Sequence, residues 1–177
     1  MRLFVAILLE SQLTEALTQA VERLRRESQS GRFPPPENHH LTLAFLGEVP
    51  PARVAAVRRA MDQVSSPPFV LHTAGWGRFP RGGADIWWMG LRREPALLSV
   101  QSQLCVALRR EGFALEERAF RPHLTLGREV VLRPGVSPLD WDGPGEQSRV
   151  DSICLMESCR EGGRMVYRCR YRRRLEQ

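Results

Sequence analysis

The hydrophobic and polar positions of the chain recur with two different periods, which predict a mixture of helices and strands. A continuous apolar run over residues 3–9 is typical of a central strand. Three segments, beginning near Gln12, Pro51 and Pro95, repeat apolar residues at helical spacing. The positions predicted to face the core are Leu13, Leu17, Val21 and Leu24 in the first helix, Val54, Val57, Met61 and Val64 in the second, and Leu97, Val100, Leu104 and Leu108 in the third.

Short apolar or alternating segments between these helices predict further strands, and segments rich in glycine and proline predict loops. Several strand-to-strand connections are too short for a parallel crossover, so we predict an α+β fold with antiparallel sheets. Alternation in the last strand predicts its arginines on one face and its tyrosines on the other. The expected strands cover residues 40–47, 69–73, 86–91, 120–126, 149–157 and 164–172, the expected loops cover 75–83 and 134–145, and the alternating residues are Arg168, Arg170, Arg172 and Arg174 against Tyr167, Cys169 and Tyr171.

One four-residue pattern occurs twice, about half the chain apart. It is His-Leu-Thr-Leu, first at 40–43 and again at 123–126, each time in a strand-like segment. On a strand, residues i and i+2 share a face, so each copy presents a histidine and a threonine on the same side. An amphipathic helix precedes each copy, which indicates a diverged duplication. We therefore expect a single domain over residues 1–177, made of two intertwined lobes related by a pseudo-twofold axis, with a central cleft and helices on the outer faces.

Composition and charge favour an anionic partner. Hydrophobic residues make up 42% of the chain, as in ordinary globular proteins, and the net charge is +6. The basic residues are all arginines, whose planar guanidinium groups suit phosphate. The four cysteines have no zinc-type spacing, and no segment is apolar for long enough to span a bilayer. We expect a cytoplasmic monomer with no membrane partner.

Two histidines on facing strands are well suited to proton transfer on a phosphodiester. A neutral imidazole can take a proton from water or a hydroxyl, and a protonated one can donate to the departing oxygen. The threonines can hydrogen-bond the other phosphate oxygens, and an arginine can offset their charge. This chemistry requires no metal or cofactor. Zinc binding is an alternative, although two histidines without acidic or thiol neighbours leave its ligand set incomplete, and packing alone is another.

The segments around the two patterns resemble the 2H phosphoesterase superfamily, and within it the RNA 2′,3′-cyclic phosphodiesterases, also called 2′-5′ RNA ligases. The resemblance covers essentially the whole chain. It implies a bilobal fold and the metal-independent opening of RNA 2′,3′-cyclic phosphate ends to 2′-phosphate ends. The segments that carry it are Arg2-Leu3-Phe4-Val5-Ala6-Ile7, Pro35-Pro36-Glu37-Asn38, His40-Leu41-Thr42-Leu43-Ala44-Phe45-Leu46-Gly47 and Phe120-Arg121-Pro122-His123-Leu124-Thr125-Leu126.

The resemblance also implies a role for each matching residue. It makes His40 the proton donor and His123 the proton acceptor, with Thr42 and Thr125 holding the phosphate oxygens. The chain departs from the family pattern at His39, which replaces an apolar residue. By alternation His39 faces away from His40, so we expect it to have a surface or packing role. It departs again at Arg32-Phe33, where the family usually has tryptophan or tyrosine.

Two substrate-binding residues also follow from the resemblance: Arg128 for phosphate and Phe45 for a nucleobase. Strict alternation would place both on the face away from the histidines, unless a bulge re-aims them. Arg121 shares the face of His123 and is the alternative that alternation favours.

Three functions remain open from the sequence. The first is hydrolysis of RNA 2′,3′-cyclic phosphate ends or of small cyclic nucleotides. The second is reversible 2′-5′ ligation of RNA by the same residues, and the third is non-catalytic binding of RNA ends. The arginines of the last strand fit either an RNA-binding track or an edge strand protected by charge.

Overall fold

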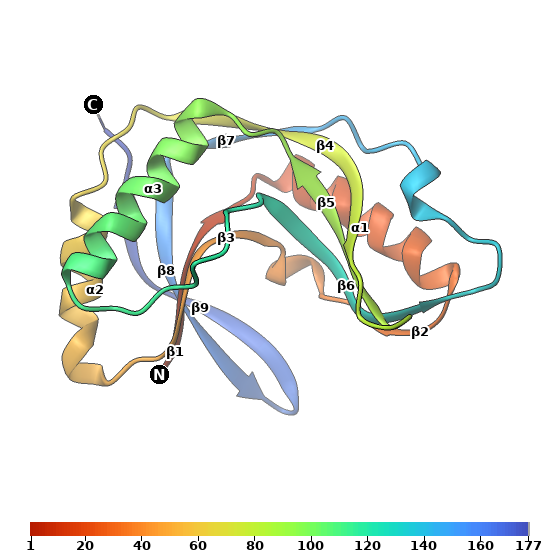
Figure 1. Cartoon of the computed structure of the whole chain (residues 1–177), viewed down its shortest axis with the longest axis horizontal. Helices are drawn as coiled ribbons and strands as arrows, with labels where there is room; N and C mark the ends of the chain where they lie inside the picture. Colours follow the sequence, from red (N-terminus) through yellow and green to blue (C-terminus); the bar gives the residue numbers. More distant parts are fainter. Residues whose placement is uncertain (177) are drawn as a thin grey trace.

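The computed structural model describes residues 1–176 and contains twelve helices and strands of regular structure, together with three short 3₁₀ turns (Figure 1). The order and type of the elements confirm the predicted α+β class. In chain order they are β1 (Arg2–Leu8), α1 (Ser11–Arg26), β2 (Ser28–Arg32), β3 (His40–Glu48), α2 (Val54–Asp62), β4 (Phe69–Phe79), β5 (Asp85–Leu91), α3 (Pro95–Arg110), β6 (His123–Leu132), β7 (Gln147–Val150), β8 (Ser152–Glu161) and β9 (Arg164–Arg174), with turns at Pro36–Asn38, Pro51–Arg53 and Pro138–Asp140.

The strands form two antiparallel sheets, one for each copy of the His-Thr pattern. The four-stranded sheet has the order β3-β1-β8-β9, and the five-stranded sheet has the order β2-β6-β5-β4-β7. The chain crosses between the two halves: α1 follows β1 but packs on β2 and β6, whereas α2 and α3 pack on the four-stranded sheet through β9 and β3. In Figure 1, α2 and α3 lie on one side of the molecule and α1 on the other. The two sheets are therefore intertwined, with β3 and β6 in contact between them.

Burial follows the predicted helical faces. The core positions of α1 and α3 are at most 3% exposed, and those of α2 are fully buried except Val54, which is half-buried. Strand β1 is buried on both faces, which explains its uninterrupted apolar sequence. Leu3, Val5 and Ile7 belong to the main hydrophobic core, whereas Phe4 and Ala6 belong to a separate small cluster. No helix within residues 1–176 is long and apolar enough to cross a membrane.

The predicted loop over 75–83 is wrong in its first half, because β4 continues through Phe79. Gly77, within the strand, serves packing rather than a turn. A Cβ at Gly77 would lie 2.1 Å from the Trp88 ring, which crosses the strand at that point. Glycine is therefore required here by the close approach of an aromatic ring, and the turn itself covers only residues 80–84.

One strand was not predicted, and two strand predictions are corrected. The unpredicted strand is β2, whose five residues show no apolar alternation and which lies at the edge of the sheet, paired with β6. The predicted strand over 149–157 is two strands in different sheets: β7 pairs with β4, and β8 pairs with β1 and β9. The strand predicted over 120–126 begins only at His123 and continues to Leu132.

The predicted alternation along β9 is wrong because the strand contains a β-bulge. Tyr171 lies opposite Leu155, but Cys169 lies opposite Met156, so Arg170 is an extra residue. The bulge moves Tyr171 to the face opposite Cys169. Its hydroxyl contacts the Asp62 carboxylate at the end of α2, outside the cleft between the sheets.

Candidate active site

Matching β-bulges follow the two His-Thr patterns and re-aim the side chains beyond them. In β3, Thr42 lies opposite Ala6 and Ala44 lies opposite Val5, so Leu43 is an extra residue. In β6, an extra residue occurs at the corresponding position, between Thr125 and Gly127. Each bulge shifts the alternation by one residue. The expectation from strict alternation is therefore wrong, because Phe45 and Arg128 return to the faces that carry the histidines.

His40 is held by two hydrogen bonds and two aromatic rings. Its Nδ1 donates to the backbone carbonyl of Asn38 (2.7 Å), and its Nε2 lies 3.0 Å from the hydroxyl oxygen of Thr42. Because the carbonyl only accepts, Nδ1 carries a hydrogen and Nε2 is the nitrogen that exchanges a proton. The ring centroid lies 4.9 Å from that of Phe4 and 5.1 Å from that of Tyr167. The first pattern thus presents Nε2 and a hydroxyl side by side.

His123 has the same orientation on the other sheet. Its Nδ1 donates to the backbone carbonyl of Arg121 (2.6 Å), which again leaves Nε2 as the exchanging nitrogen. The ring centroid lies 5.0 Å from that of Phe79 and 5.8 Å from that of Trp88. Both imidazoles are therefore fixed by a carbonyl two residues earlier in the chain and by aromatic neighbours.

The electrostatic environment connects the two histidines. Burial lowers the pKa of both imidazoles, and their hydrogen bonds to backbone carbonyls partly oppose this effect. The Arg128 guanidinium lowers the pKa of His40 and also that of His123, so it lies within electrostatic range of both rings. His123 also lowers the pKa of His40, and Arg121 lowers the pKa of His123. The two patterns and Arg128 consequently share one site.

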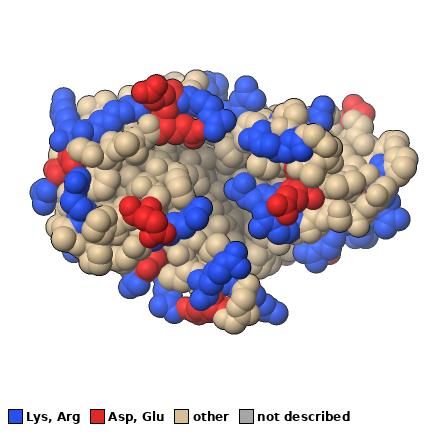
Figure 2. Space-filling model, turned by 60° about the horizontal axis from the view of Figure 1, so that its bottom comes forward, with Lys and Arg blue, Asp and Glu red and all other residues tan. Residues whose placement is uncertain are grey.

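The remaining predicted residues surround this site. Thr42 and Thr125 are half-buried on the same faces as their histidines. Phe45 is 50% exposed, with the Arg2 guanidinium 5.2 Å from its ring centroid, so one aromatic face is open to a ligand. Arg121 lies over the Phe79 ring at 5.9 Å. The face turned forward in Figure 2 is hollowed near its middle, and arginine side chains lie on both sides of the hollow.

His39 packs inside the protein. It is 6% exposed, and within residues 1–176 neither ring nitrogen has a hydrogen-bond partner. Burial, with a smaller contribution from His40, lowers its pKa to about 4, so the ring is neutral near pH 7. The position agrees with the predicted packing role and not with a surface role.

Four aromatic residues that touch the imidazoles were not predicted as site residues: Phe4, Phe79, Trp88 and Tyr167. Phe4 stands in an apolar run without alternation, so its face could not be predicted from the sequence. The other three reach the histidines only through the pairing of distant strands.

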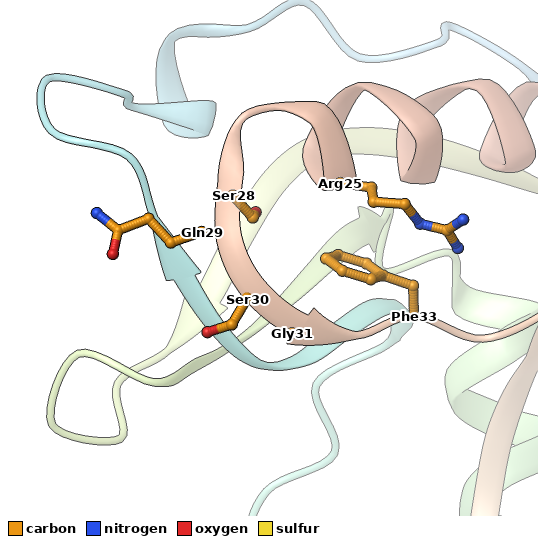
Figure 3. A pocket seen from close by; sticks show the side chains of 6 residues that line it. All are labelled: Arg25, Ser28, Gln29, Ser30, Gly31 and Phe33. Carbon is orange, nitrogen blue, oxygen red and sulfur yellow. The ribbon is translucent and has the colours of Figure 1, made fainter.

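A pocket of about 420 Å³ lies away from these residues, between the end of α1 and β2 (Figure 3). The Phe33 ring forms one wall, with the Arg25 guanidinium 5.3 Å from its centroid. A Cβ at Gly127 would lie 3.1 Å from this ring and 2.7 Å from Val130, which explains the glycine inside the β6 bulge. Phe33 therefore packs beneath the bulge that re-aims Arg128.

Metal ligands do not gather within the described residues. No group of three or more histidine, cysteine, aspartate or glutamate side chains in residues 1–176 is arranged to hold an ion. The side-chain charges that shift the pKa of His40 are those of Arg128 and His123, and the side-chain charges that shift the pKa of His123 are those of Arg128 and Arg121.

Comparisons with known proteins agree with this fold. The family described as LigT like Phosphoesterase matches residues 7–88. An RNA 2′,3′-cyclic phosphodiesterase of Archaeoglobus fulgidus is 31% identical over 140 residues, which cover 78% of this chain and 78% of that protein. Another, from Geobacillus stearothermophilus, is 37% identical over 124 residues, which cover 66% of this chain but only 40% of that protein.

A solved structure is also similar over almost the whole chain. The crystal structure of Escherichia coli LigT complexed with 3′-AMP has a TM-score of 0.82 and 29% sequence identity, and the match covers 99% of this chain and 98% of that one. The fold and the paired motifs thus define the class of 2H phosphoesterases. Within that class, the chain belongs to the LigT-like phosphoesterase family of RNA 2′,3′-cyclic phosphodiesterases.

Proposed function

We propose that this protein hydrolyses RNA 2′,3′-cyclic phosphate ends, or small cyclic nucleotides, to products with a 2′-phosphate. The observation that carries the proposal is the pair of imidazoles that present Nε2 for proton exchange, both within electrostatic range of Arg128. Its relatives named RNA 2′,3′-cyclic phosphodiesterase support the substrate, as does the 3′-AMP complex of Escherichia coli LigT.

In the proposed reaction, His123 is the base and His40 is the acid. His123 Nε2 takes a proton from water while the water oxygen attacks phosphorus. The bond from phosphorus to O3′ breaks, and His40 Nε2 supplies a proton to the departing O3′. The product carries the phosphate on O2′, and a later proton exchange with solvent restores both imidazoles.

This division of roles follows from the family resemblance, because burial and Arg128 favour the neutral form of both imidazoles. The Thr42 hydroxyl lies 3.0 Å from His40 Nε2, so both can contact one phosphate. Thr125 would bind a non-bridging oxygen from the other side, and Arg128 would stabilise the charge that develops there.

The base of the terminal nucleotide would lie against the exposed face of Phe45. Aromatic rings bind single-stranded nucleobases by stacking, with little dependence on sequence. Arg2 covers part of the same ring and adds positive charge near the substrate. Arg121, which lies over Phe79, would contact the phosphate from the His123 side.

Hydrolysis should proceed unchanged in EDTA, because the two imidazoles supply both proton transfers. The test is product analysis of an oligonucleotide ending in 2′,3′-cyclic phosphate, treated with the protein and chelator. Susceptibility of the product to a phosphatase, with authentic 2′- and 3′-phosphate standards, identifies the bond that breaks.

Each alternative gives a different result in that assay. Activity that disappears in EDTA and returns with zinc or manganese would contradict the metal-independent mechanism. A joined product, formed when an RNA with a 5′-hydroxyl is added, would indicate 2′-5′ ligation. Binding of the oligonucleotide without any product would indicate an RNA-end-binding protein.

The pH dependence of kcat/KM should be bell-shaped, since one imidazole must be neutral and the other protonated. This ratio reports the free protein, in which burial and Arg128 lower both pKa values. A lowered pKa means that each ring loses its proton at lower pH, so the maximum should lie below the free histidine value of about 6.5. The bound phosphate anion opposes this effect, so the kcat profile should lie at higher pH.

The limbs of the bell belong to the coupled pair, and variants assign them. In His123→Ala the acidic limb should vanish from the residual activity, while the alkaline limb, which depends on protonated His40, should remain. A flat wild-type profile between about pH 5 and 9 would exclude paired imidazole catalysis.

A further inference from the structure

The hairpin formed by β8 and β9 reaches back to the segment that carries His40. The Asn38 side chain donates through Nδ2 to the backbone carbonyl of Met165 (2.9 Å), near the hairpin turn. Asn38 is 8% exposed, and its own backbone carbonyl accepts the hydrogen bond from His40. One residue thus connects the hairpin to the imidazole, although the hairpin projects from the body of the molecule in Figure 1.

Tyr167 closes a small hydrophobic cluster under the His40 ring. The buried members of this cluster, which is separate from the main core, are Phe4, Ala6, Cys154 and Met156. The rings of Phe4, His40 and Tyr167 are all in mutual contact: the Phe4 and Tyr167 centroids are 5.0 Å apart, and Tyr167 meets the imidazole edge-on at 89°. The imidazole therefore lies against a packed surface, and Tyr167 is the part of that surface that the hairpin contributes.

The two histidines differ in this respect. His123 packs against Trp88 on β5, the strand adjacent to β6, and against Phe79 on β4, the strand after it. His40 stands on an edge strand, and one of its two rings comes from the opposite edge strand, β9. The β8–β9 hairpin therefore supplies one of the two rings against His40 and neither of the rings against His123.

We propose that Tyr167 is a positioning residue, which holds the His40 imidazole with Nε2 toward the reacting phosphate and keeps water from its ring. The proposal rests on the proposed role of His40 as proton donor. The aromatic ring carries the effect, because it makes the contact with the imidazole. The β8–β9 hairpin is then part of the catalytic apparatus without contacting the substrate.

The charges around His40 determine the direction of the expected change. Arg128 and His123 face it from β6, and His39 precedes it in the chain. Burial is the largest cause of the lowered pKa of His40. Removing the Tyr167 ring readmits water and leaves the charged groups in place, so the pKa should rise toward that of a free histidine.

The experiment follows the His40 ring by NMR titration in the substrate-free protein, alongside kcat and KM. In Tyr167→Ala we expect a higher His40 pKa and a kcat reduced about 10- to 100-fold by misplacement of the acid, with KM little changed. Tyr167→Phe keeps the ring and should behave as wild type. Tyr171→Ala removes a tyrosine from the other face of β9 and should leave the His40 pKa unchanged.

A His40 pKa that stays at the wild-type value in Tyr167→Ala would overturn the proposal, as would an equal shift in Tyr171→Ala. If Tyr167→Ala does not fold, Asn38→Ala tests the same contact by releasing Met165, and it should raise the His40 pKa in the same direction. An inactive wild-type protein would instead overturn the proposed function. The titration would still decide whether Tyr167 holds the ring.

Discussion

Replacing either His40 or His123 with alanine should reduce kcat by about 10²–10⁴-fold, the usual contribution of a general acid or base. Each imidazole presents Nε2 because Nδ1 is bound to a backbone carbonyl, and Arg128, which acts on both rings, stays protonated and cannot take over the lost proton transfer. RNA binding should persist, because the arginines remain. The measurement is single-turnover hydrolysis of a cyclic-phosphate oligonucleotide, with binding measured separately.

The chain contains a matched control for this experiment. His72 lies on β4, and its Nδ1 contacts the Glu94 carboxylate at 2.9 Å. Neither residue is among the groups that shift the pKa of His40 or His123. His72→Ala should therefore leave kcat unchanged. In the double variant of His40 and His123, the increase in activation free energy should be smaller than the sum of the increases in the two single variants, since the residues act as a unit. A near-normal rate in either single variant would refute paired catalysis.

Arg128→Ala should reduce kcat by about 10²–10³-fold, as expected when one group that stabilises transition-state charge is removed. The guanidinium is also a cause of the lowered pKa of both imidazoles, so its removal should shift the kcat/KM profile to higher pH. Thr42→Ala and Thr125→Ala should each reduce kcat less than Arg128→Ala does, because each removes one neutral hydrogen bond.

Arg172→Ala is the control for Arg128→Ala. Arg172 is exposed on β9 and donates to the Ser152 hydroxyl oxygen (3.2 Å). Its loss should leave hydrolysis of a dinucleotide unchanged and weaken binding of long RNA in a salt-dependent way, as for a contact to the backbone alone. Equal effects of the two substitutions on a dinucleotide would show that Arg128 does not bind the reacting phosphate, and Arg121 would become the residue to test.

The contrast between Arg128 and the β9 arginines also bears on the function of the last strand. Arg168 and Arg170 form ion pairs with Glu161 and Glu157 of the neighbouring strand, so part of the strand's charge is neutralised within the sheet. β9 is an edge strand, and charged side chains along an edge oppose pairing with other sheets. This part of β9 favours the edge-protection hypothesis over an uninterrupted RNA track.

The regular elements could largely be predicted from local pattern. The stripe of Leu13, Leu17 and Leu24 predicts α1, and these leucines are fully buried. The prediction failed where pairing decides the structure. Ser28–Arg32 has no apolar period and forms a strand only because β6 offers hydrogen-bond partners. The glycines of β4 signal a turn, but one of them is required by the Trp88 ring.

By itself, the sequence determined the α+β class, the three helices and the two His-Thr faces, because these depend on spacing between near neighbours in the chain. Only the tertiary structure decided which other side chains join those faces. Phe45 and Arg128 reach the cleft because an extra residue in each strand shifts the alternation, and that extra residue is defined by the partner strand. Tyr167 reaches His40 because β8 and β9 pair as a hairpin that reaches back to Asn38. Register and bulges arise between strands, so no single stretch of the sequence contains them.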